Sequence, residues 1–203
     1  MNMISSTRIK VSLIALILLP VMQGCASIQE IAALREVEFD IDNVSDAILA
    51  NIQLDDIRGV SDINPMAVLD LTSAVRDKNL PLQFQLHVAA SNPSENNVSA
   101  RLVGLDWTLF IDNRETVSGT LNQNTVMPPG QRVDIPIGIQ LELFEFFDHN
   151  LPDMLDLALN IAGIGGEPKQ LMLRATPTID TPLGPIRYPG TIEILDRRVG
   201  SSE

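Results

Sequence analysis

The sequence predicts a mainly β protein, an antiparallel β-sandwich with one to three short helices. Three observations predict this fold class. Apolar and polar residues alternate without a miss from 133 to 143, which indicates an antiparallel strand with one face in a core. About seven shorter segments of this kind occur along the chain, and turn-forming Asn, Pro and Gly residues separate them. Short strands at that spacing are typical of two packed sheets.

The first third of the chain is expected to form two strands and a helix. Apolar residues alternate with acidic ones over 37–42, which indicates a half-buried strand, and a second strand is expected near 51–60. Asn64-Pro65 opens a helical stretch that ends near Lys78, because proline suits the first turn of a helix. The apolar residues that keep helical spacing there are Met66, Leu69, Ala74 and Val75.

The centre of the chain predicts the sheets most clearly. Strands are expected at 80–88, 103–111 and 116–121, followed by the long alternating strand of 133–143. Pro136 lies in that last strand and cannot donate a backbone hydrogen bond, so we expect a sheet edge or a bulge there.

The C-terminal part changes pattern and then returns to strands. Residues 144–164 are largely apolar and are interrupted at Pro152, which predicts one or two short helices. A strand is expected over 171–179, and a last one near 192–194 closes a sheet.

The N-terminus has the layout of a bacterial lipoprotein signal. Arg8 and Lys10 precede a short apolar run, 11–19, and Gly24 comes directly before Cys25, the one cysteine of the chain. The apolar run is about half of the ~20 residues that a helix needs to cross a bilayer, which disfavours a transmembrane anchor. We therefore expect cleavage before Cys25.

Cys25 is then expected to become the mature N-terminus and to carry acyl chains on its sulfur and its amine. Two or more chains give stable anchoring, so the lipid bilayer is the expected partner of Cys25. A lone thiol is also a candidate nucleophile, but the lipid explains this cysteine better. Ala26 follows it; in bacterial lipoproteins as a family, Asp at that place tends to retain the protein in the inner membrane. Because Ala26 stands there in place of Asp, the resemblance to bacterial lipoproteins implies export to the outer membrane. The expected location is therefore the periplasmic face of that membrane, held by the lipid.

The expected organisation is therefore a leader, a tether and one folded domain. Its segments are a signal peptide at 1–24, a lipidated tether at 25–36, the β-sandwich domain at 37–196 and a tail at 197–203.

The composition is acidic, with a formal net charge of −12. Loss of the leader removes Arg8 and Lys10 and no acid, which moves the net charge to −14. Such a chain repels phosphate backbones, so we expect no nucleic-acid partner. It gains nothing from anionic lipid surfaces, so the lipid anchor is expected to hold it at the membrane.

An ordered series of motifs resembles a known family. The series comprises Asn92-Pro93 after a strand, Trp107, Gly119, Pro129-Gly130 and Pro136. In this order the residues resemble the water-stress-and-hypersensitive-response (WHy) domain of the second, folded group of late embryogenesis abundant proteins. The resemblance is best from 80 to 143. It implies an immunoglobulin- or fibronectin-like β-sandwich with a helix, a desiccation or stress-protection role, no enzymatic activity and no cofactor. The lipid anchor and the apolar segment 144–164 depart from that family.

Few residues indicate chemistry. His87 falls on the polar side of its strand and is expected to be a surface histidine. His149 has Asp148 and Asp153 beside it, but such carboxylates more often cap helices than bind a metal, so no metal site is predicted. The sequence has no serine-hydrolase elbow and no P-loop or dinucleotide fingerprint. Trp107 is on the core face of its strand, which favours packing over ligand binding.

The apolar cluster of Phe144, Phe146 and Phe147 has two interpretations. It closes one end of the sandwich as part of the core, or it forms an exposed apolar surface that contacts lipid, a client protein or a partner.

Three functions compete, and an enzyme is a distant fourth. The first is a stress-protective or client-binding lipoprotein of the bacterial envelope, with envelope proteins as its clients. The second is a periplasmic carrier of an apolar ligand such as a lipid, which requires an apolar cavity of several hundred Å³, on the order of ligand pockets in general. The third is a structural adaptor in an envelope complex that uses a sheet edge for strand addition.

Overall fold

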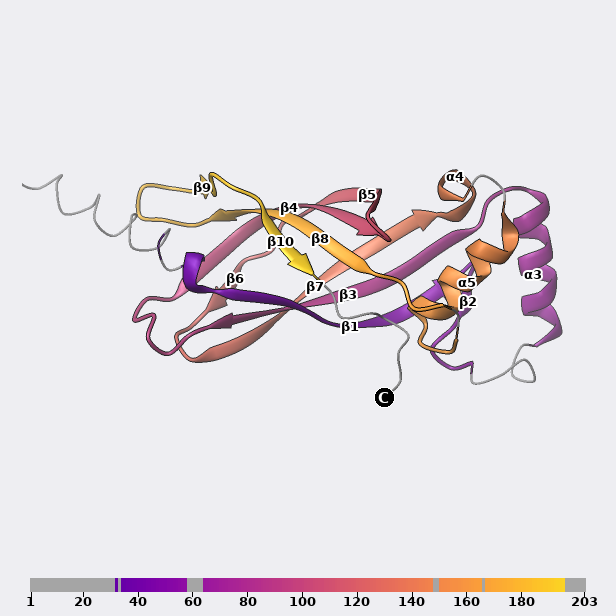
Figure 1. Ribbon diagram of the computed structural model, residues 1–203, viewed down its shortest axis with the longest axis horizontal. Helices are drawn as coiled ribbons and strands as arrows, with labels where there is room; N and C mark the ends of the chain where they lie inside the picture. The colour runs from indigo at the N-terminus through magenta and orange to yellow at the C-terminus, as the bar shows by residue number, and fades with distance from the viewer. Residues whose placement is uncertain (1–31, 33, 58–63, 148–149, 166, 196–203) are drawn as a thin grey trace, which may run out of the picture.

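The computed structural model describes residues 32, 34–57, 64–147, 150–165 and 167–195. Two antiparallel sheets pack face to face and form an elongated sandwich (Figure 1). Three helices gather at one end, α3 (Pro65–Arg76), α4 (Leu143–Phe146) and α5 (Leu151–Ile161), and the first described residues lie at the other. The predicted fold class, a mainly β sandwich with short helices, is confirmed.

The first sheet has the strand order β2-β1-β3-β7. Its strands are β1 (Glu38–Leu49), β2 (Ile52–Gln53), β3 (Pro81–Asn92) and β7 (Gln131–Glu142). β3 and β7 pair over their whole length without a bulge, whereas β1 has two register shifts against β3. β7 is the last strand of this sheet, so Pro136 lies in an edge strand as predicted and not in a bulge.

The second sheet has the order β10-β8-β4-β5, with β6 beside β4 and β9 beside β8. Its strands are β4 (Ala100–Ile111), β5 (Arg114–Leu121), β6 (Thr125–Met127), β8 (Leu171–Ile179), β9 (Ile186–Arg187) and β10 (Ile192–Leu195). A two-residue turn joins β4 to β5. Asp112 and Asn113 both have positive φ, which is the type I′ geometry that matches the twist of a hairpin.

One hydrophobic core fills the space between the sheets. Trp107 of β4 and Ile137 of β7 both belong to it, 7% and 1% exposed, so the predicted core faces of these two strands are confirmed. The alternation predicted for 133–143 also holds, because the inward residues from Ile135 to Leu143 are buried.

The helices are where the sequence predicts them. Asn64 caps α3 (Pro65–Arg76) by accepting a 2.8 Å hydrogen bond from the backbone N–H of Ala67. The segment 144–164 contains α4 (Leu143–Phe146) and α5 (Leu151–Ile161).

The strand predicted near 51–60 is wrong in extent. Within the described part of this segment, 51–57, only Ile52 and Gln53 pair with β1. A tight turn at Ala50-Asn51 precedes them, and a second turn follows in which Ile57 N–H donates to the carbonyl of Leu54. Residues 58–60 lie outside the described residues. The structure also has more strands than the seven or so expected, since short pieces such as β6 and β9 carry too few residues to show alternation.

Candidate functional site

The motif residues Asn92, Pro93 and Gly130 come together at one end of the sandwich. The Asn92 side chain is 2% exposed and donates from Nδ2 to the carbonyls of Met127 (2.7 Å) and Val98 (3.2 Å). Its Oδ1 accepts a 2.8 Å hydrogen bond from Asn96. The Gly130 N–H donates to the Asn92 carbonyl at 2.8 Å, and Gly130 has a φ of +71° that favours glycine. Asn92 thus joins β3 to the loop before β4 and to β6.

Trp107 and Gly119 are a second pair of motif residues that contact each other. They are directly opposite each other in the β4–β5 ladder. A Cβ atom on Gly119 would lie 2.5 Å from Trp107 Cζ2 and 2.9 Å from Cε2, which is closer than packed atoms allow. The indole ring therefore occupies the space that glycine leaves free, and both residues have a packing role here.

His87 differs from the surface histidine that the sequence predicts. Its ring is 22% exposed, with Nδ1 2.8 Å from Asp134 Oδ2 and Nε2 2.9 Å from Ser45 Oγ. These residues come from β3, β7 and β1, so one side chain links three neighbouring strands. Sequence alternation places His87 and Asp134 on the polar faces of predicted strands, whereas Ser45 lies beyond the strand predicted over 37–42. The strand register that brings the three residues together is not readable from the sequence.

Ser45, His87 and Asp134 are linked in the way that a nucleophile, a base and an orienting acid are linked in a catalytic triad. However, Ser45 Oγ is 2.9 Å from Asp46 Oδ2 as well as from His87 Nε2, so the Asp46 carboxylate competes with His87 for the single hydrogen of the hydroxyl. The Asp46 carboxylate beside Oγ would also repel the oxyanion that acyl transfer generates. The arrangement therefore supports strand linkage rather than hydrolysis.

The phenylalanine cluster closes the sandwich. Phe146 is 8% exposed and belongs to the core, while Phe144 and Phe147 are half-buried and pack against it. The Phe146 and Phe147 rings meet edge to face, with 4.7 Å between centroids, and the Arg114 guanidinium lies over Phe146. Of the two interpretations, the structure favours the core one over the exposed apolar surface.

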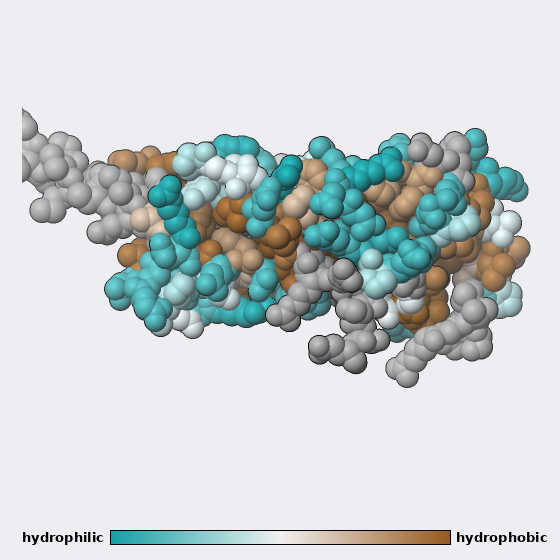
Figure 2. Space-filling model, in the orientation of Figure 1, coloured by the Kyte–Doolittle hydropathy of each residue, from teal (hydrophilic) through white to brown (hydrophobic). Residues whose placement is uncertain are grey.

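An exposed apolar surface is found instead on α3, where the sequence gives no sign of it. Met66, Val68 and Leu69 are 65%, 52% and 59% exposed. Ala67 is buried, and Leu71 and Ala74 are half-buried against the core, so these residues form the inward face. Figure 2 shows apolar surface at the end of the molecule that α3 occupies. Both faces of α3 contain apolar residues, which is why the sequence does not identify the exposed one.

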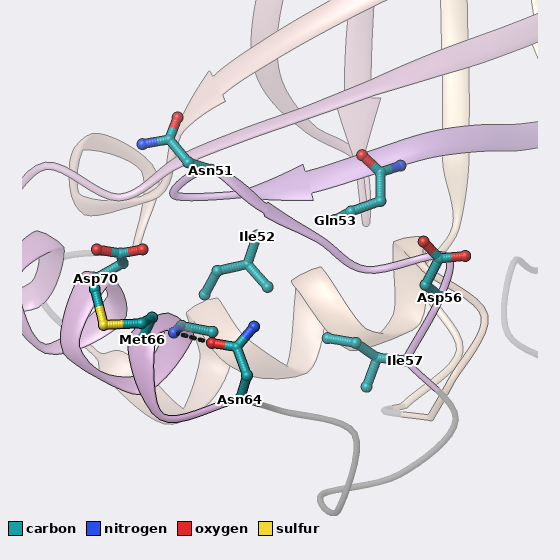
Figure 3. A pocket seen from close by; sticks show the side chains of 9 residues that line it. Asn51, Ile52, Gln53, Asp56, Ile57, Asn64, Met66 and Asp70 are labelled. Carbon is teal, nitrogen blue, oxygen red and sulfur yellow. Dashed lines mark hydrogen bonds between the residues drawn. The ribbon is translucent and has the colours of Figure 1, made fainter.

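A groove of about 320 Å³ lies between this helix and the β1–β2 hairpin (Figure 3). It is lined by Asn51, Ile52, Gln53, Asp56, Ile57, Asn64, Met66, Ala67 and Asp70. Apolar side chains of Ile52 and Ile57 lie between the carboxylates of Asp70 and Asp56, which are at opposite ends of the view. Among the described residues, neither carboxylate forms an ion pair.

The outer face of the second sheet has a polar network around Asp106. Thr120 donates a 2.9 Å hydrogen bond to Asp106 Oδ1, and Arg187 binds Oδ2. Two hydrogen bonds hold the pKa of Asp106 below its ordinary value. The bond from Thr120 has the largest effect, and the bond from Arg187 has the next largest.

The lowered pKa of Asp106 gives a pH-dependent contribution to stability. An Asp whose pKa is lower in the folded than in the unfolded state stabilises the fold above the unfolded value of about 3.9, and this contribution is lost as the pH falls through the folded value. Asp106→Asn should therefore destabilise the protein at pH 7, and its difference from wild type should shrink below about pH 4. Urea unfolding at several pH values measures this. Asp40→Asn, an exposed change in β1, is the control, and an equal pH-dependent difference in both variants would contradict the prediction.

Several residues of the predicted sites lie outside the described residues. They are Cys25, Asp148 and His149. Asp153 is described and accepts a 2.6 Å hydrogen bond from Asn150 at the start of α5. In the described part of the chain, no group of three or more His, Cys, Asp or Glu side chains is placed to hold a metal ion. None of the helices in these ranges is long and apolar enough to cross a membrane.

Three solved structures are similar to this chain. A protein from Archaeoglobus fulgidus is 12% identical, with a TM-score of 0.35 over 77% of this chain and 94% of that one. A protein from Arabidopsis thaliana is 16% identical, with a TM-score of 0.36 over 57% and 72%. A candidate late embryogenesis abundant protein is 14% identical, with a TM-score of 0.36 over 96% and 93%. No family model matches the sequence, and no curated protein is significantly similar to it.

Proposed function

We propose that this chain is a lipid-anchored, non-enzymatic protein of the bacterial envelope that binds and protects client proteins when water is lost. The leader that ends at Gly24-Cys25 supports the anchor. The ordered motif series, from Asn92-Pro93 to Pro136, supports the protective role through its resemblance to the WHy domain.

The exposed apolar side of α3 is the observation that carries client binding. Met66, Val68 and Leu69 are each more than half exposed, although the core of the sandwich is filled. Contiguous exposed apolar surface is typical of sites that contact other molecules. A partly dehydrated client exposes apolar segments of its own, and burying them against α3 would keep them from one another.

The carrier of an apolar ligand has less support. A carrier needs an enclosed apolar cavity, whereas Leu86, Leu109 and Ile137 are 0–1% exposed between the sheets. The groove beside α3 is open and partly polar. This comparison favours a surface that binds clients over an interior that holds lipid.

Acylation of Cys25 is the expected result that tests the anchor. Intact mass of the membrane-extracted protein should show the lipid increment on a chain that begins at Cys25. The variant Cys25→Ser should leave the outer-membrane fraction. If this variant still fractionates with the outer membrane, the anchor is not at Cys25.

Protection is tested with a soluble version that starts at Ala26. It should reduce aggregation of a test enzyme through drying better than an equal mass of an inert acidic protein, because charge alone gives some benefit. Replacing Met66 and Leu69 with serine should remove most of that advantage. Leu183→Ser, which removes an equally exposed leucine in the β8–β9 turn at the other end of the molecule, should not.

Two outcomes would count against the proposal. Wild type that protects no better than the acidic control would contradict a protective role. Co-purification of a stoichiometric lipid, together with that result, would favour the carrier instead.

A further inference from the structure

From the groove beside α3 we infer the class of client segment that this protein binds: a polypeptide stretch in which basic side chains flank apolar ones. This inference rests on the proposed function and adds which segment of a client is recognised. It is carried by the shape, the lining and the charge of the groove.

The walls of the groove are well defined. One wall is the β1–β2 hairpin, whose Ala50-Asn51 turn has positive φ at both residues, and Leu54 N–H ties it back to the Ala47 carbonyl at 2.7 Å. The other wall is the first turns of α3, which Asn64 caps. Met66 and Asp70 are four residues apart on this helix, so they stand on the same side of it and both line the groove.

The size of the groove selects side chains rather than lipid. Its volume of about 320 Å³ is at the small end of the range for ligand pockets, about 300–1,000 Å³. Ile52, Ile57 and Met66 provide apolar contact in its middle. That space suits one or two apolar side chains of an extended peptide.

The charge of the groove selects the flanking residues. Asp56 and Asp70 lie at its opposite ends, and none of the described residues that line it is a Lys or Arg. The whole chain has a net charge of −12. A Lys or Arg on each side of the apolar residues would reach one carboxylate each. A second copy of this chain docked by the same groove would place its own Asp56 and Asp70 against these acids, and like charges repel. The two carboxylates would repel an anionic lipid surface for the same reason.

The test uses the full chain in nanodiscs of zwitterionic lipid and three fluorescent peptides of equal length. The first has leucines flanked by lysines, the second has leucines flanked by glutamates, and the third has serines flanked by lysines. Fluorescence anisotropy should show the tightest binding for the first peptide and weaker binding for the other two. Empty nanodiscs measure what the lipid alone contributes.

Two variants separate the groove from general acidity. Asp56→Asn with Asp70→Asn keeps the shape. Loss of two exposed ion pairs at about 0.5–0.7 kcal/mol each corresponds to about five- to tenfold weaker binding of the first peptide. Glu38→Gln with Asp40→Asn makes the same change in net charge on β1 and should leave binding unchanged. Circular dichroism of each variant checks the fold.

The outcomes distinguish this inference from the proposed function. Equal affinity in wild type and in the Asp56/Asp70 variant, or an equal loss in the Glu38/Asp40 variant, would overturn the inference. If the Asp56/Asp70 variant still protects a drying enzyme, client binding stands and uses another surface. Peptide binding as expected, without protection, would leave the groove assigned and the protective role contradicted.

Discussion

Trp107→Ala is expected to lower the free energy of unfolding by about 3–5 kcal/mol, because it removes a large buried side chain and leaves a cavity between the sheets. Gly119→Ala should cost about 1–3 kcal/mol for the opposite reason, since the added methyl group would overlap the indole ring. Urea unfolding monitored by circular dichroism measures both.

The two substitutions should not be additive. Without the indole, a methyl group on Gly119 has room, so Gly119→Ala should cost little in the Trp107→Ala background. Gly138→Ala is the control for a strand glycine, because a Cβ there meets nothing within 4 Å. It should be neutral or slightly stabilising. Additive losses in the double variant would show that the ring does not occupy the space at Gly119.

Asn92→Leu is expected to cost about 2–5 kcal/mol. The carbonyl of Met127 would lose its side-chain donor in a buried place, and that of Val98 in a part-buried one. An unsatisfied buried group costs about 1–3 kcal/mol, and a part-buried one costs less. Asn92→Asp has nearly the same shape but directs carboxylate oxygens at those two carbonyls, so it should also destabilise strongly at pH 7.

Asn97→Ala is the matched control for Asn92, because Asn97 is exposed in the loop that follows β3. A change there should stay within about 0.5 kcal/mol of wild type. Thermal unfolding of the three variants gives the comparison. A small loss in Asn92→Leu, close to that of Asn97→Ala, would contradict the role of Asn92 in joining β3 to β6.

The parts of the fold that the sequence predicts are those with a local cause. The strict alternation from Val133 to Leu143 is a property of one strand, and the Asn64-Pro65 start of α3 is a property of one turn. The extent of β2 was overestimated because the chain turns away after Gln53 through backbone hydrogen bonds that have no sequence pattern of their own.

The candidate site depends on causes that are not local. Ser45, His87 and Asp134 meet only because three strands pair in one register. The sequence also gives Met66 and Leu69 the same apolar character as Leu71 and Ala74. Only the packing of α3 on the sandwich decides that the first pair is exposed and the second pair faces the core.

Pro136 in the edge strand β7 bears on what happens when the protein itself is concentrated. Drying brings copies together, and a long regular sheet edge then invites polymerisation by strand pairing. Proline is accommodated in such a strand where its nitrogen faces the open side, so an added strand would find a hydrogen-bond donor missing there. At the other edge of the same sheet, β2 pairs only with Ile48 and Leu49, so β1 forms most of that edge, and its bulges distort the strand that a neighbour would have to match. Because both edges of this sheet disfavour pairing with a neighbouring copy, concentrated molecules would separate again when water is added.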